Sequence, residues 1–106
     1  MFDQSVGEFE ELVLLSILGL DEAFAVAIRT HILETGQRPA TLGGVYRALS
    51  RLERKGMVRS RLGAVTRKKG GKRKRLYEVT PAGIRAIQDM RMARERLWAG
   101  LRIQPS

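Results

Sequence analysis

Apolar residues along the first half of the chain recur at helical spacing in three stretches. From Glu8 to Leu18 they occupy more than one side, which is typical of a helix at the centre of a small bundle. From Ala23 to Thr35 they recur about every 3.6 residues, and Gly36 follows as a stop. A third stretch runs from a capping Thr41 to Lys55, with one apolar stripe three or four residues apart: Leu42, Val45, Leu49 and Leu52. The pattern predicts three helices, the third ended by Gly56.

After Gly56 the pattern changes to strict alternation. Residues 57–62 place Val58, Ser60 and Leu62 on one side and arginines on the other, and residues 75–79 alternate again. The basic stretch between them contains a pair of glycines at 70 and 71, which suits a hairpin tip. Thr80-Pro81 then predicts a capped helix that continues to about Ile103 and stops before Pro105. The order ααα-ββ-α is mainly α with a small β ribbon, as in a winged helix-turn-helix.

The length and composition indicate one domain. A chain of 106 residues has the size of one domain. We expect residues 1–80 to form a winged helix-turn-helix unit and residues 81–106 to form a C-terminal dimerisation helix within the same compact domain. There is no apolar run of about 18 residues, so no transmembrane helix is expected. Acids rather than bases precede the apolar run near the N-terminus, which is wrong for a signal peptide. With no cysteine there is no disulfide or thiolate metal site, which fits a reducing cytosol.

The positive charge is concentrated in one part of the chain. Residues 37–75 hold fourteen Lys or Arg and a single acid, a balance of +13. Residues 1–36 have seven acids and one Arg, or −6, and residues 76–106 have five Arg and three acids, or +2, which together give the net +9. A basic helix followed by a basic two-stranded ribbon favours an acidic polymer as partner, and the helix-and-wing pattern favours double-stranded DNA.

The third helix is predicted to present a polar face to the major groove. Arg47 and Arg51 lie one turn apart on that face, and arginine is well shaped for two-point contact with guanine or phosphate. Two glycines in its first turn allow a phosphate to approach the backbone, or alternatively allow tight helix packing. Tyr46 is expected beside the apolar stripe, with its ring in the core and its hydroxyl at solvent or phosphate.

The basic hairpin tip is interpreted as a phosphate-binding wing that adds affinity, while the helix selects sequence. The alternative is a solvated loop with no binding role. The expected DNA-binding residues are Thr41, Gly43, Gly44, Tyr46, Arg47, Ser50, Arg51, Arg67, Lys68, Lys69, Lys72, Arg73 and Lys74.

Several motifs resemble one known family. The pattern Gly44-Val45-Tyr46-x-x-Leu49-x-x-Leu52-Glu53-x-x-Gly56-x-Val58 resembles the signature of the PadR family of bacterial winged-helix regulators. The residues from Gly70 to Gly83 are similar to that family's wing and its entry into the last helix, and residues 7–14 and 24–28 also match. One departure is Ala25, where the family usually has Gly. The resemblance implies a sequence-specific regulator, a repressor of the short subclass with a single C-terminal helix, acting as a homodimer on a pseudo-palindromic operator.

The last helix carries more apolar surface than one small domain can cover. The expected dimer-interface residues are Ile87, Met90, Leu97, Trp98 and Leu101. In some members of the resembled family, an aromatic residue on this helix lines a pocket for flat aromatic ligands. Trp98, the only Trp, is the matching candidate for binding a small aromatic effector. The simpler alternative is that Trp98 anchors the interface and binds no ligand.

Other functional classes fit the sequence less well. An enzyme is not expected, because the single histidine, His31, has no metal-spaced or nucleophilic partner and no serine lies in a nucleophile elbow. No cofactor and no metal are expected. The main alternative is a basic RNA-binding or ribosome-associated protein, although only Tyr77 could stack a base from the ribbon. A winged helix used only for protein contacts would favour a less basic wing.

Overall fold

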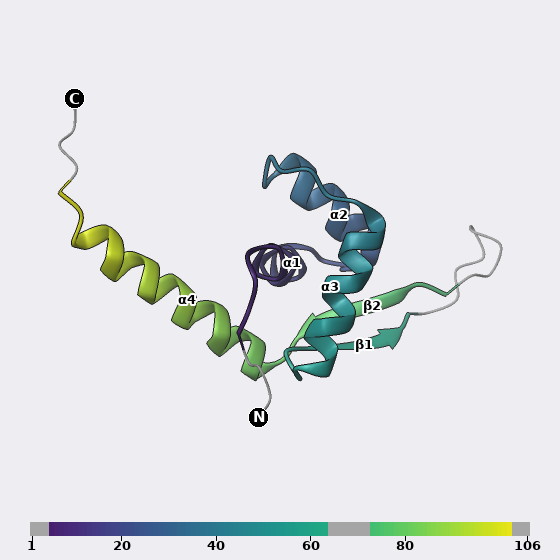
Figure 1. Cartoon of the computed structure of the whole chain (residues 1–106). Helices are drawn as coiled ribbons and strands as arrows, with labels where there is room; N and C mark the ends of the chain where they lie inside the picture. The colour runs from purple at the N-terminus through teal and green to yellow at the C-terminus, as the bar shows by residue number, and fades with distance from the viewer. Residues whose placement is uncertain (1–4, 64–72, 103–106) are drawn as a thin grey trace.

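The computed structural model describes residues 5–63 and 73–102 and has the expected order of elements (Figure 1). It contains α1 (Glu8–Gly19), α2 (Ala25–Glu34), α3 (Leu42–Arg54), β1 (Val58–Leu62), β2 (Arg75–Val79) and α4 (Pro81–Ala99). The fold class predicted from the sequence, mainly α with a small β ribbon, is therefore confirmed.

Helix α1 lies in the middle of the structure, where it contacts α2, α3, α4 and β2 (Figure 1). Val13 and Leu14 on α1 are completely buried, and Ile28 on α2 and Leu52 on α3 meet them in one core. The central position predicted for the first helix is thus confirmed. Its surface is not covered all round, because Leu15 and Leu18 remain about half exposed.

The ribbon is a two-stranded antiparallel sheet in which Ser60 lies opposite Tyr77 and Arg59 lies opposite Glu78. The predicted alternation is confirmed, because Val58, Ser60 and Leu62 lie opposite Val79, Tyr77 and Arg75 and so share one face of the ribbon. On the free edge of β2, the amide of Tyr77 donates to the carbonyl of Ala23 at 2.9 Å. This bond attaches the ribbon to the connection between α1 and α2.

Two of the predicted helix caps are present. The Thr41 side chain accepts a hydrogen bond from the amide of Gly44 at 3.0 Å at the start of α3. The Thr80 side chain accepts from the amide of Gly83 at 3.2 Å, with Pro81 in the first turn of α4. Both helices therefore begin where the sequence predicted.

Three other boundaries differ from the sequence prediction. Helix α2 begins at Ala25 instead of Ala23, because Ala23 is used in the bond to β2 and the backbone is extended at Phe24. The left-handed residue after α2 is Gln37, with φ of 50°, and not Gly36. Helix α4 ends at Ala99 instead of about Ile103. The amide of Leu101 donates a hydrogen bond to the carbonyl of Trp98, three residues earlier, and this tighter turn ends the helix.

Adjacent carboxylates on α1 join it to two other helices. The buried Glu10 carboxylate lies 3.0 Å from Nζ of Lys55, at the end of α3, and 3.9 Å from Nε of Arg51. The neighbouring Glu11, also buried, pairs with Nη2 of Arg94 on α4 at 3.1 Å. Both carboxylates are thus buried with a cationic partner, as burial of a charge requires. Within residues 5–63 and 73–102, no helix is long and apolar enough to cross a membrane.

Candidate nucleic-acid interface

Helix α3 buries one face and exposes the other. Val45, Ala48, Leu49 and Leu52 are buried at helical spacing, and they hold the helix against α1 and α2. The residues predicted to contact DNA lie on the exposed side of its N-terminal cap and turns: Thr41, Gly43, Tyr46, Arg47, Ser50 and Arg51. The helix therefore has the two-sided form that insertion into a groove requires.

The two glycines at the start of α3 have different surroundings. A Cβ at Gly44 would lie 2.9 Å from Oγ1 of Thr41, so the glycine makes room for the capping hydroxyl. A Cβ at Gly43 would lie 3.3 Å from Nη1 of Arg47, the flexible end of an exposed side chain. Gly44 is thus explained by the cap, whereas Gly43 leaves exposed backbone on the outer side.

The wing carries cations at its base. The predicted wing residues Arg67, Lys68, Lys69 and Lys72 lie outside the residues that the structure describes. Arg73 donates from Nε to the carbonyl of Gly63 at 2.9 Å, next to the strand ends that flank residues 64–72 in the sequence. Nζ of Lys74 lies 4.0 Å from the centroid of the Phe24 ring, a cation–π contact. Arg75 donates to Oγ of Ser60 at 3.1 Å.

A groove of about 340 Å³ lies where α2, α3 and β2 meet, and it joins the predicted helix residues to the predicted wing residues. Its lining combines an uncapped helix start, three aromatic rings and three cations: Phe24, Ala25, Val26, Tyr46, Arg73, Lys74, Arg75 and Tyr77. Tyr46 is 51% exposed, so its ring lies at the surface and less in the core than the sequence suggested. The position of Phe24 at this site was not predicted from the sequence.

Tyr77 is the most buried hydroxyl of this groove. Burial raises the pKa of Tyr77 above 10.0, and the carboxylate of Glu53 raises it further; the nearby Arg75 lowers it, and the phenol of Tyr46 makes the smallest contribution, which raises it. The phenol therefore stays protonated and uncharged at neutral pH, and it remains a hydrogen-bond donor.

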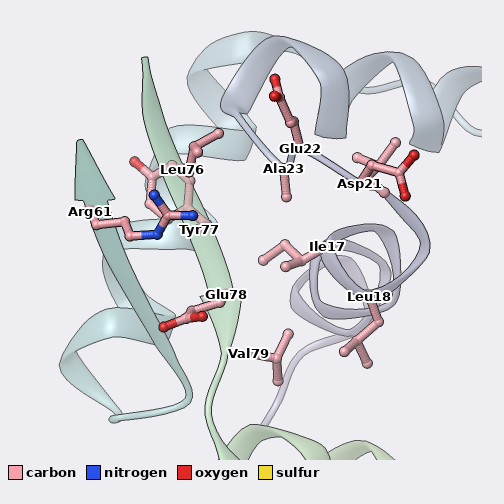
Figure 2. Close-up of a pocket in the computed structure, with 11 residues that line it drawn as sticks. Ile17, Leu18, Asp21, Glu22, Ala23, Arg61, Leu76, Tyr77, Glu78 and Val79 are labelled. Atoms are coloured by element: carbon pink, nitrogen blue, oxygen red, sulfur yellow. The ribbon is translucent and has the colours of Figure 1, made fainter. Parts of the chain in front are cut away.

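A second groove, of about 290 Å³, lies between the other side of the ribbon and the end of α1 (Figure 2). Figure 2 shows Arg61 and Glu78 on the ribbon, with Asp21 and Glu22 on the connection that follows α1. Among the described residues that line it, three carboxylates against a single arginine make this side a poor site for an anion.

The most exposed apolar side chains of the last segment lie at the C-terminal end of α4 and just after it. Leu97 is 71% exposed, Trp98 66%, and Leu101 about half. Ile87, at 8% exposed, belongs to the core of its own chain, and Met90 lies between these extremes. A groove of about 370 Å³ between α1 and α4 is bordered by Leu15, Ile87 and Trp98 and by charged residues of both helices. The five predicted interface residues are therefore divided between core and surface.

The one histidine has a structural role. Nδ1 of His31 is 2.9 Å from Oγ of Ser16, a buried serine on α1, and His31 itself is half-buried. Among the described residues there is no cluster of three or more His, Cys, Asp or Glu side chains that could hold a metal ion.

The three helices, the ribbon and the exposed basic face of α3 define a winged helix-turn-helix protein. A profile of the transcriptional regulator PadR-like family matches residues 14–89. The chain belongs to this family, so its members' role as DNA-binding transcriptional regulators, and not enzymes, applies to it. The family resemblance seen in the sequence is confirmed.

Solved structures share this fold at low sequence identity. A PadR-like transcription factor from Bacteroides fragilis is 20% identical, with a TM-score of 0.71, over 86% of this chain and 84% of that one. A PadR-like transcriptional regulator from Bacillus cereus is 18% identical, with a TM-score of 0.70 and the same coverage of 86% and 84%. A PadR family regulator from Eggerthella lenta is 24% identical, with a TM-score of 0.68, over 88% and 81%. None of the curated proteins compared matches the chain.

Proposed function

We propose that this chain is a sequence-specific, double-stranded DNA-binding repressor that acts as a homodimer. The observation that carries the proposal is the outer face of α3. Arg47, Ser50 and Arg51 are exposed there, while the opposite stripe holds the helix in the core. Side chains of this kind on an exposed helix can reach base edges in the major groove without disturbing the fold. A protein that occupies an operator excludes other proteins from the same DNA, which supports repression as the mode of action.

The wing is proposed to supply affinity for the DNA backbone. The cations at its base, Arg73 and Lys74, lie beside the groove that borders α3. The predicted wing residues outside the described ranges add four more positive charges to the same segment of sequence. Contacts from these cations to phosphate would be largely independent of base sequence, and they would weaken with salt.

The proposed dimer is built on α4. Figure 1 shows α4 passing beside α1 and extending away from α2 and α3, which leaves its C-terminal half beyond the body of the fold. The exposed Trp98 and the half-exposed Leu15 on α1 both border the α1–α4 groove, and Leu97, next to Trp98 in the chain, is also exposed. A second copy of α4 is the occupant that covers these side chains in both subunits at once. Two α3 helices would then lie about 34 Å apart on a pseudo-palindromic operator.

The α1–α4 groove is also the proposed site for a small aromatic effector. Trp98 borders it with a mostly exposed ring, and Leu15 and Ile87 provide apolar walls. A flat ligand stacked on Trp98 would change the angle between subunits only if it binds one arrangement better than another. The alternative is that Trp98 serves only as an anchor between the two copies.

Selection of bound sequences from random duplex DNA by the purified protein tests the proposal directly. A palindromic consensus with half-sites about one helical turn apart is the expected result. A single half-site would reject the dimer while keeping sequence recognition. No enrichment of any sequence would reject the regulator's proposed specificity. As a DNA-bound regulator, the chain is proposed to act in the bacterial cytosol, in association with the nucleoid.

A further inference from the structure

Helix α4 is attached to the rest of the chain at its first turns. The amide of Thr80 donates to the carbonyl of Met57 at 3.0 Å, and the hydroxyl of Thr80 donates to the carbonyl of Gly56 at 2.6 Å. Gly83 packs so closely that a Cβ there would overlap the backbone of Met57. One turn further along α4, Ile87 is buried in the core. These contacts hold the start of α4, but they leave the direction of its remaining turns to be fixed elsewhere.

One ion pair holds α4 beyond Ile87. Nη2 of Arg94 lies 3.1 Å from Oε1 of Glu11 on α1, and the side chain of Glu11 is only 10% exposed. Among the described residues this is the one ion pair that joins α4 to another element, since the pair between Arg91 and Glu95 lies within α4. Glu11 and Arg94 both border the α1–α4 groove of about 370 Å³. The pair therefore joins the two helices beside a space that side chains do not fill.

The same turn of α1 is also attached to α3. Glu10, the neighbour of Glu11, is buried and lies 3.0 Å from Nζ of Lys55 at the C-terminal end of α3. Successive residues of a helix point about 100° apart, so these two carboxylates reach different helices. Helix α1 thus connects α3 with α4 through two adjacent buried carboxylates, and the two ion pairs together set the direction of α4 relative to α3.

A small change in the direction of α4 has a large effect at its far end. At about 1.5 Å per residue the helix extends about 18 Å from Ile87 to Ala99, so a rotation of about 10° displaces its end by about 3 Å. One base-pair step of duplex DNA is about 3.4 Å. In a dimer built on α4, such a rotation would move the two α3 helices out of register with successive turns of the major groove.

We infer that Glu11 and Arg94 are positioning residues, which fix the direction of α4 and thereby the separation of the two α3 helices. The inference rests on the proposed homodimer through α4. It assigns no DNA contact to either residue, because Glu11 is buried and Arg94 lies on the helix that extends away from α3 (Figure 1). The intact pair gives one preferred spacing between two half-sites, whereas a broken pair allows several.

Distances between the two subunits test the inference without DNA. The chain has no cysteine, so Ser50→Cys introduces a single site for a spin label on the exposed face of each α3. Pulsed electron paramagnetic resonance of the labelled dimer measures the distribution of distances between the two α3 helices. One narrow distribution is expected in this background. Glu11→Gln and Arg94→Gln are each expected to broaden it by about 3 Å, the displacement that a rotation of about 10° produces.

Further variants separate the direction of α4 from stability. Glu11→Gln combined with Arg94→Gln leaves no buried charge unpaired, so the free energy of unfolding should recover while the broad distribution remains. A merely structural role would recover both. Arg94→Lys keeps the charge and is expected to restore a narrow distribution in part. Arg96→Gln is the matched control, because Arg96 is exposed on the opposite side of α4, and it is expected to leave the distribution unchanged.

The preferred spacing of half-sites gives a second measurement. Palindromic duplexes that differ by one base pair in the spacing of the selected half-site are compared by fluorescence anisotropy. The unsubstituted chain is expected to lose about tenfold in affinity one base pair from the best spacing, and the two Gln variants less than about threefold. Affinity for a single half-site is expected to stay the same, because neither residue contacts DNA.

The outcomes distinguish this inference from the proposed dimer. A narrow distribution and an unchanged spacing preference in both Gln variants would overturn the inference and leave the dimer standing. A broad distribution already in the Ser50→Cys background would do the same. If that background gave no distance between subunits, the dimer would be overturned and the inference with it. Equal broadening in Arg96→Gln and Arg94→Gln would also overturn the inference, since it would show only a general effect of charge on α4.

Discussion

The carboxylate of Glu10 lies 3.0 Å from Nζ of Lys55, so the first turn of α1 is joined to the end of the exposed helix α3. The same carboxylate accepts a hydrogen bond from the amide of Gly7 at 2.9 Å, and both Glu10 and Lys55 are largely removed from solvent. Loss of one partner of such a pair leaves a charge without compensation in a poorly solvated place.

Glu10→Gln is therefore expected to lower the free energy of unfolding by about 2–4 kcal/mol. Urea denaturation followed by circular dichroism measures this change. Glu78→Gln is the matched control, because the pair between Glu78 and Arg59 is exposed on the ribbon and should contribute less than about 1 kcal/mol. Equal losses in the two variants would contradict the role assigned to burial.

Gly83→Ala is expected to disrupt the junction of α4 with the ribbon. A Cβ there would lie 2.4 Å from the carbonyl oxygen of Met57 and 2.7 Å from Cγ1 of Val79. The backbone oxygen cannot move without shifting β1, so the expected loss of stability is about 3 kcal/mol or more. Gly100→Ala is the control, since a Cβ there meets nothing closer than 3.7 Å. Thermal unfolding of both variants checks this, and an unchanged midpoint for Gly83→Ala would refute the packing described.

Binding of duplex DNA is expected to depend strongly on salt. If about six to ten phosphates are contacted, affinity should fall by roughly 10³ to 10⁵ between about 50 and 200 mM salt. Fluorescence anisotropy with a labelled duplex and with a structured RNA of equal length provides the measurement. Tighter binding of the RNA at every salt concentration would favour the RNA-binding alternative and reject duplex DNA as the preferred partner.

Substitutions in α3 and in the wing are expected to change DNA binding in different ways. Arg47→Ala should cost about 1–3 kcal/mol and relax the preference at one base position. The double variant Lys68→Ala and Lys69→Ala should weaken all sequences alike and reduce the dependence on salt. Selection from random duplexes with each variant tests both statements. A changed consensus in the wing variant, with an unchanged one in Arg47→Ala, would show that the assigned roles are reversed.

Trp98→Ala is expected to weaken the homodimer. Met92→Ala is the control, because Met92 is similarly exposed but lies with Arg85 and Arg96 on the opposite side of α4. Sedimentation at micromolar concentration should show a dimer for the wild type and for Met92→Ala, and dissociation for Trp98→Ala. A wild-type monomer would reject the dimer. Quenching of Trp98 fluorescence by aromatic compounds tests the effector, and an unquenched signal with unchanged DNA binding would leave Trp98 without that role.

Local patterns were sufficient to predict α3 and the strand pair. Thr41 caps α3 through a bond only three residues away, and the apolar stripe that follows is determined by helical spacing alone. The alternation of residues 57–62 likewise predicted which side chains share a face of the ribbon. Interactions within a few residues can be recognised without knowing the fold.

Features that depend on distant residues were not predicted. The bond from Tyr77 to Ala23 shortens α2, and no local signal near Ala23 indicates that β2 will lie beside it. The groove beside Phe24 also forms only when three elements far apart in the sequence come together. Similarly, Leu15 and Ile87 look equally apolar in the sequence, but only Ile87 is covered by its own chain.

The division of α3 into a buried stripe and an exposed face has an evolutionary consequence. Because Val45, Ala48, Leu49 and Leu52 hold the helix, substitutions at exposed positions such as Arg47 and Ser50 should change stability by only about 0.5 kcal/mol. Descendants of this sequence can therefore exchange these side chains one at a time while remaining folded. The exception is Arg51, whose Nε lies 3.9 Å from the Glu10 carboxylate, so change there is constrained from within the molecule.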